Sequence, residues 1–137
     1  MSASAGKESK RIKLLLADDH AVVRSGTREL LERQPDLDIV GEAADGEEAV
    51  RLTHELQPDV VVMDVRMPKM TGFEACEALK ADEQTKDIPV IFLSAKGQEI
   101  EVKTGLDLGA VDYFLKPFAP DKLTKRVSEI LSEHGKL

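Results

Sequence analysis

The chain has 137 residues, of which 42% are hydrophobic and 33% charged, a composition typical of one globular domain. Its net charge of −7 counts against a domain that binds nucleic acid directly, because such domains are usually basic. No apolar run is long enough to span a bilayer, and the first residues, MSASAGKESKR, lack the hydrophobic stretch of a secretory signal. The single cysteine, Cys76, has no partner for an internal disulfide, so these features together predict a cytoplasmic protein without membrane contact.

Short apolar runs of strand length alternate with segments of helical pattern along the whole chain. The runs are rich in Val, Ile and Leu, as expected of parallel strands that are covered on both faces. In chain order, we predict strand 12–17, helix 22–33, strand 39–43, a helix around 49–56, strand 60–63, a helix around 73–79, strand 89–93, helix 97–108, strand 111–115 and a helix around 123–131.

Two of these elements have distinctive features. The run at residues 39–43 is short and interrupted by Gly41, which favours a strand at the edge of the sheet. The helix at residues 97–108 has the weakest hydrophobic period, so we expect it to be mobile. Five strand–helix units in strict alternation predict an α/β fold, a doubly wound sandwich with a parallel sheet between two helical layers.

Polar or ionisable side chains follow four of the five predicted strands. Asp18 and Asp19 follow the first strand, Asp64 the third, Ser94 the fourth and Lys116 the fifth. Because ligands of such folds bind outside the carboxyl ends of the strands, we expect these groups to converge at one edge. Three carboxylates at close range repel one another, and oxygen ligands suit Mg²⁺. We therefore predict a magnesium site that is incomplete until a phosphoryl group arrives, and Asp64 could attack that group.

Four motifs at these strand ends resemble the receiver domains of two-component response regulators, over roughly residues 11–131. The motifs are LLLADDH, VVVMDVRMPKMTG, IFLSA and DYFLKPF, and all four occur in order. The resemblance implies a flavodoxin-like (βα)5 sandwich with strand order 2-1-3-4-5. It divides the chain into a flexible N-terminal arm at 1–10, a receiver domain at 11–133 and a C-terminal tail at 134–137.

The resemblance implies that Asp64 accepts a phosphoryl group from a phosphohistidine. The donor would be a histidine kinase or a histidine phosphotransfer protein. Asp19 would bind Mg²⁺ directly and Asp18 mainly through water, with Mn²⁺ as an alternative ion. The metal ligands would be Asp18, Asp19, Asp64 and the backbone carbonyl of Arg66.

Other matching residues would transmit the phosphorylated state. Lys116 and Ser94 would contact the phosphoryl oxygens, and Ser94 and Tyr113 would act as switch residues. The peptide bond before Pro117 would be cis. Phosphorylation would thereby reset the face of the fourth helix, fifth strand and fifth helix, which would meet a partner, an output domain or a second copy in a homodimer.

The chain also departs from the usual family pattern. Ser94 stands where many members have Thr, which keeps the hydroxyl and loses a methyl group. Ala95 is small, as is usual. Arg66 and Lys96 flank the phosphate site at positions that influence the rate of dephosphorylation, so that rate stays open. Asp112 and Arg126 match a pair that crosses the dimer of the winged-helix class, although other charged positions of that class do not match.

Two other classes use related chemistry or a related fold. A phosphatase of the haloacid-dehalogenase type needs a second Asp two residues after the nucleophile, where this chain has Arg66. A flavodoxin-like cofactor carrier needs a phosphate loop after the first strand, where Asp18 and Asp19 would repel phosphate. We therefore expect a switch, not a turnover enzyme, with slow Mg²⁺-dependent autodephosphorylation at most. A stand-alone receiver and the N-terminal domain of a transcription factor both fit the sequence.

Overall fold

The computed structural model of the chain describes residues 11–94 and 99–133. The predicted N-terminal arm, the C-terminal tail, Ala95, Lys96 and the first two residues of the predicted fourth helix lie outside the described residues. No helix in the described part of the chain is long and apolar enough to cross a membrane.

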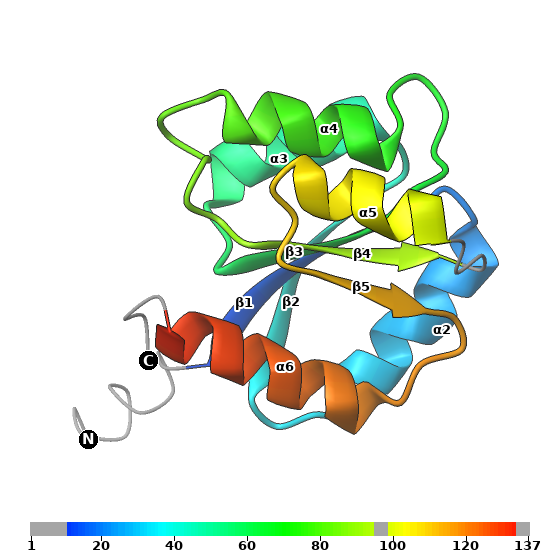
Figure 1. The fold of residues 1–137 in the computed structure, drawn as a ribbon. Helices are drawn as coiled ribbons and strands as arrows, with labels where there is room; N and C mark the ends of the chain where they lie inside the picture. The colour runs from blue at the N-terminus through cyan, green and yellow to red at the C-terminus, as the bar shows by residue number, and fades with distance from the viewer. Residues whose placement is uncertain (1–10, 95–98, 134–137) are drawn as a thin grey trace.

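Strands and helices alternate along the described chain, as the sequence predicts (Figure 1). The five strands form one parallel sheet in the order β2-β1-β3-β4-β5, which confirms the predicted fold class and strand order. The elements are β1 (Ile12–Ala17), α2 (Ala21–Glu32), β2 (Leu37–Ala43), α3 (Gly46–Leu56), β3 (Val60–Asp64), α4 (Gly72–Lys80), β4 (Val90–Ser94), α5 (Glu99–Asp107), β5 (Asp112–Leu115) and α6 (Pro120–Glu133).

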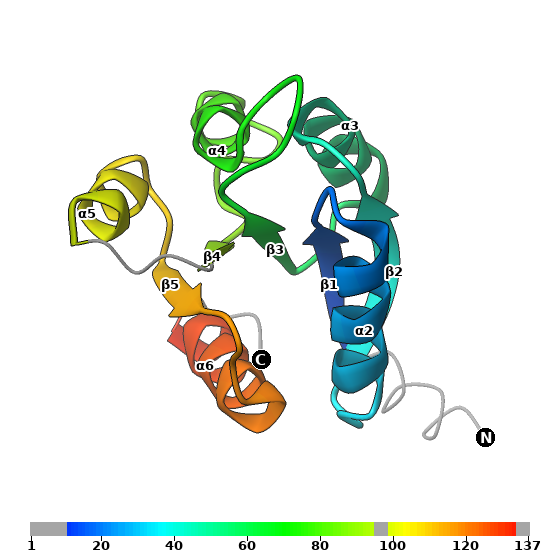
Figure 2. The same ribbon diagram turned by 90° about the vertical axis from the view of Figure 1, so that its right-hand side faces the viewer.

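Two helical layers cover the sheet, with α3, α4 and α5 on one face and α2 and α6 on the other (Figures 1 and 2). Successive strand residues alternate between two buried clusters, since side chains of a strand point to opposite faces. In β1, Leu15 packs toward α3 and α4, whereas Leu14 and Leu16 pack toward α2 and α6. The central strands are therefore fixed from both sides, and their carboxyl ends form a rigid base for the loops that follow.

Side-chain caps begin two of the helices near that edge. The Oδ1 of Asp45 accepts a hydrogen bond of 2.8 Å from the Glu48 amide at the start of α3. Thr71 and Glu74 form a reciprocal capping box at the start of α4, which satisfies amides that the helix itself leaves without acceptors. These caps fix the residues at which α3 and α4 begin.

The edge strand β2 differs from its prediction in length. It begins at Leu37, two residues before the predicted start, because exposed Asp38 interrupts the apolar run while buried Leu37 pairs with Ile12. The strand also contains a bulge. Leu14 pairs with Ile39 and Leu15 with Gly41, so Val40 is an extra residue without a counterpart in β1.

Candidate functional site

The acidic strand ends lie side by side at one edge of the sheet. Ala17 pairs with Met63 in neighbouring strands, so Asp18, which follows β1, lies beside Asp64 at the end of β3. Ser94 ends the next strand, β4, and pairs with Leu115 of β5, directly before Lys116. Figure 2 looks onto this edge of the sheet. The parallel topology thus brings the predicted groups together from four separate parts of the sequence.

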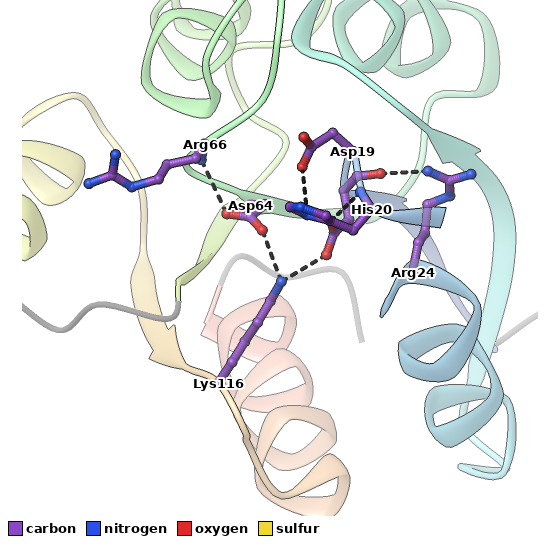
Figure 3. Close-up of polar contacts among 7 residues, drawn as sticks. Asp19, His20, Arg24, Asp64, Arg66 and Lys116 are labelled. Carbon is purple, nitrogen blue, oxygen red and sulfur yellow. Dashed lines mark hydrogen bonds and ion pairs between the residues drawn. The ribbon is translucent and has the colours of Figure 1, made fainter. Parts of the chain in front are cut away.

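Lys116 connects two of the carboxylates (Figure 3). Its Nζ donates to Oδ2 of Asp18 at 2.8 Å and to Oδ2 of Asp64 at 2.9 Å. The side chains of Asp18 and Asp64 are only 2% and 12% exposed, so these bonds are well shielded from water. Burial acts to lower the pKa of Lys116, but the hydrogen bonds and charges of the two carboxylates outweigh it and raise that pKa. Lys116 is therefore a cation at neutral pH.

The acidic pair after β1 contains a carboxylate oxygen without a hydrogen bond. Oδ1 of Asp18 accepts a bond of 2.9 Å from the His20 amide. Oδ1 of Asp19, in contrast, is buried and accepts none among the described residues, although Nδ1 of His20 lies 3.1 Å away. One ligand atom from each of Asp18, Asp19 and His20 lies within 4.8 Å of the others. A buried anionic oxygen without a donor fits a hard divalent cation, and the oxygen-rich donor set favours Mg²⁺.

The second oxygen of Asp64 faces the loop between β3 and α4. Its Oδ1 accepts a hydrogen bond of 3.1 Å from the Arg66 amide, as Figure 3 shows. The start of α4 approaches this loop closely, since a Cβ added to Gly72 would lie 2.3 Å from the carbonyl oxygen of Asp64. Gly72 also donates its amide to the Val65 carbonyl at 2.8 Å. Only glycine permits this approach, which holds the backbone of Asp64 in place.

The predicted switch residues lie on the two outer strands of this half of the sheet. Ser94 is 2% exposed, and its carbonyl accepts a 2.8 Å hydrogen bond from the Lys116 amide. Tyr113 is partly buried, and its ring centroid lies 6.2 Å from that of Phe92 in β4. The bond between Lys116 and Pro117 is cis, the form that the resemblance implies. These residues thus lie on, or directly after, the two strands next to β3 on this side of the site.

The sequence did not reveal two residues that support the site. Arg24 of α2 donates from Nη1 to the carbonyl oxygen of Asp18 at 2.6 Å (Figure 3). Gly72, the last residue of the VVVMDVRMPKMTG motif, allows the close approach to Asp64. No motif signals a bond from a helix arginine to a backbone carbonyl, and the motif that contains Gly72 does not show which atoms this residue approaches.

The comparisons with known proteins all find the same family. Residues 14–128 match the sequence model of the response regulator receiver domain. The probable transcriptional regulator ycf27 of Guillardia theta is 40% identical over 128 residues, which cover 90% of this chain and 47% of the relative. The transcriptional regulatory protein YdfI of Bacillus subtilis is 40% identical over 111 residues, covering 81% and 51% respectively. The chain thus spans about half the length of these curated relatives.

Solved structures agree with the sequence relatives. A LuxR-family two-component response regulator from Aurantimonas sp. SI85-9A1 has a TM-score of 0.82 at 32% identity, covering 90% of this chain and 86% of that one. The receiver domain of a sensor histidine kinase from Pseudomonas aeruginosa, solved with magnesium coordinated in its active-site cleft, has a TM-score of 0.80 at 26% identity and covers 89% and 98%. With the family match over residues 14–128, this chain belongs to the response regulator receiver domains of two-component signal transduction.

Proposed function

We propose that Asp64 is the phosphate acceptor of this receiver and that residues 11–133 form the receiver domain. The observation that carries the proposal is the position of Lys116, whose Nζ contacts both Asp64 and the neighbouring Asp18. A cation at this point stabilises the negative charge that develops on a phosphoryl group during transfer. Asp64 ends β3 at the carboxyl edge of the sheet, where folds of this kind bind their ligands.

The proposed reaction transfers a phosphoryl group from a phosphohistidine of a histidine kinase or histidine phosphotransfer protein. An Oδ of Asp64 forms a bond to phosphorus while the phosphorus–nitrogen bond of the donor breaks. The electron pair of that bond returns to the imidazole nitrogen, and the product is an aspartyl phosphate. Ser94, at the end of the adjacent strand β4, would donate its hydroxyl to a phosphoryl oxygen.

The donor set at the acidic edge fits a magnesium ion. Asp18, Asp19 and Asp64, with the Arg66 carbonyl, would hold it, and Mn²⁺ offers similar oxygen chemistry. When bound, the ion neutralises negative charge on the carboxylates and on the phosphoryl oxygens. The buried Oδ1 of Asp19, without a hydrogen bond in the described chain, supports this assignment.

A groove beside Lys116 favours a donor protein that carries its phosphohistidine on a helix. The groove has a volume of about 370 Å³ and lies between α2 and the segment after β5. Val23 and Leu30 of α2, each 43% exposed, line it together with Phe118. An amphipathic helix could place apolar side chains here while its histidine reaches the adjacent Asp64.

We propose that phosphorylation acts on the face formed by α5, β5 and α6, through Ser94 and Tyr113. This face would meet an output domain, a partner or a second copy of the chain. Arg126 of α6 now pairs with Asp112 of β5 inside the chain, with Nε 2.6 Å from Oδ2. A homodimer that used this pair would have to exchange the internal bond for an external one. With a net charge of −7, the domain would leave nucleic-acid binding to other parts of a regulator.

The proposal is tested by incubating the chain with acetyl phosphate, with and without Mg²⁺, and measuring its intact mass. We expect one added phosphoryl group that requires Mg²⁺, is absent in Asp64→Asn and persists in Asp38→Asn, a matched change on an exposed residue. The phosphoryl group should then leave slowly by Mg²⁺-dependent hydrolysis. Equal labelling of wild type and Asp64→Asn would refute the acceptor assignment.

A further inference from the structure

Arg24 links the edge strand of the sheet to the acidic pair. Its guanidinium donates from Nε to Oε1 of Glu42 in β2 at 2.9 Å and from Nη1 to the carbonyl oxygen of Asp18 at 2.6 Å. The Arg24 side chain is only 18% exposed, so it lies between α2 and the sheet rather than in solvent. A planar guanidinium carries its N–H donors in a rigid fork, which suits it to hold two acceptors at a set distance.

Glu42 is itself held in place. It accepts hydrogen bonds from both Arg24 and Arg28 of α2. The hydrogen bond from Arg28 is the main cause that lowers the pKa of Glu42, although burial acts in the opposite direction. Glu42 therefore stays an anion at neutral pH and anchors the guanidinium of Arg24 to β2.

The Asp18 carbonyl belongs to the peptide unit that joins Asp18 to Asp19. A bond to this carbonyl holds the backbone from which both carboxylates extend, because the planar peptide unit joins the two Cα atoms rigidly. The Asp18 side chain is held at Oδ1 by the His20 amide and at Oδ2 by Lys116. The bond from Arg24 fixes the backbone of the same residue from the opposite side.

We propose that Arg24 is a positioning residue of the magnesium site, and that it orients the peptide between Asp18 and Asp19 so that both carboxylates face the ion. The inference rests on the proposed magnesium site and extends it to α2 and β2. Arg24 contacts neither the phosphate acceptor nor, through its side chain, any proposed metal ligand oxygen.

Charge and geometry predict opposite effects when Arg24 is replaced. Loss of a positive charge near an acidic pair would strengthen Mg²⁺ binding if Arg24 acted only through its charge. Loss of the hydrogen bond to the Asp18 carbonyl would weaken it, and changes around metal ligands usually reduce affinity by 10- to 100-fold. The sign of the change therefore separates a positioning role from an electrostatic one.

The experiment is a calorimetric titration of MgCl2 into the wild-type chain and the variants Arg24→Ala, Arg24→Lys and Arg33→Ala. Arg33 is the matched control, because it ends the same helix and its side chain is 70% exposed. We expect Arg24→Ala to weaken Mg²⁺ binding about tenfold. Arg24→Lys should not restore it, since one ammonium group lacks the fork that reaches both acceptors. Arg33→Ala should bind like the wild type.

Labelling by acetyl phosphate adds a second readout. In Arg24→Ala, the Mg²⁺ concentration for half-maximal labelling should rise about tenfold, while the rate at saturating Mg²⁺ stays close to that of the wild type. If Arg24→Ala does not fold, Glu42→Gln should give a smaller loss of Mg²⁺ affinity in the same direction. Unchanged or tighter Mg²⁺ binding in Arg24→Ala, or in Glu42→Gln where Arg24→Ala does not fold, would overturn the positioning role alone. A wild-type chain that binds no Mg²⁺ would overturn the magnesium site and this inference with it.

Discussion

The buried oxygen of Asp19 predicts that one substitution should change stability in opposite directions with and without Mg²⁺. Oδ1 of Asp19 is buried and accepts no hydrogen bond in the described chain, while the side chain as a whole is 27% exposed. Asp19→Asn keeps the shape and removes the negative charge. The amide could also donate to Nδ1 of His20, which lies 3.1 Å from this oxygen. Without metal, the variant should therefore be the more stable protein.

The magnitude follows from the burial of that one oxygen. A buried polar atom without a partner costs about 1–3 kcal/mol, and the exposure of the rest of this carboxylate favours the lower end. We expect Asp19→Asn to gain about 1 kcal/mol in EDTA, or roughly 3 °C in Tm for a chain of this size. At an Mg²⁺ concentration of about 100 times Kd, the wild type gains about 2.7 kcal/mol from binding. The variant lacks the proposed direct ligand and should gain much less.

The assay is urea denaturation of wild type, Asp19→Asn and Asp38→Asn, each in EDTA and in MgCl2. Asp38→Asn makes the same charge change on an exposed residue of β2 and should behave like the wild type in both conditions. The curves of wild type and Asp19→Asn should exchange their order when Mg²⁺ replaces EDTA. If Asp19→Asn is no more stable than Asp38→Asn in EDTA, the buried oxygen carries no cost and the reasoning is wrong.

Three further changes test other parts of the structure. Lys116→Met should lower the free energy of unfolding by roughly 2 kcal/mol at neutral pH. Because the pKa of Lys116 is raised in the folded chain, this difference should shrink only as the pH rises through the folded pKa, above about 10.4. A difference in urea stability that stays constant to high pH would contradict the ion pairs of Lys116. Gly72→Ala places a Cβ 2.3 Å from the Asp64 carbonyl oxygen, so it should lower the free energy of unfolding by about 2 kcal/mol in thermal scans and slow phosphorylation. A Cβ added at Gly26 meets no atom within 4 Å, so Gly26→Ala should be neutral or stabilising in the same scans. Thr71→Ala removes the capping box of α4 and should lower the free energy of unfolding by about 1 kcal/mol, and an unchanged Tm would count against that role.

The fold and the main site could be predicted because they depend on patterns that lie along the sequence. Buried parallel strands are continuous apolar runs, and the residue that follows each run marks the carboxyl edge. This rule alone brings Asp18, Asp64 and Lys116 together, and the structure joins them through bonds of 2.8 and 2.9 Å. The predicted bounds of β2 were less accurate, because exposed Asp38 alternates with buried neighbours in this edge strand and breaks the apolar run.

The supporting contacts could not be predicted because they depend on pairs that are distant in the chain and carry no motif. In the sequence, Arg24 and Glu42 look like ordinary charged residues. Only the coordinates show that Arg24 donates both to Glu42 and to a backbone carbonyl. The close approach of Gly72 to Asp64 joins the start of α4 to the end of β3 and is visible only in the coordinates. Side-chain chemistry at strand ends is therefore visible in a sequence, whereas the bonds that orient it require coordinates.

The bulge in β2 determines which side of the sheet Glu42 faces. Leu37 and Ile39 lie in the cluster under α2 and α6, yet Ala43, an even number of residues later, lies in the cluster under α3 and α4. The extra residue Val40 reverses the alternation of the strand, because a shift of one residue exchanges its two faces. Glu42 therefore faces α2, where Arg24 can bind it. A regular strand that kept Val40 in the ladder would turn Glu42 to the opposite layer, away from Arg24. The bulge of this edge strand contains no residue of the proposed site, yet it allows the contact that Arg24 makes beside the acidic pair.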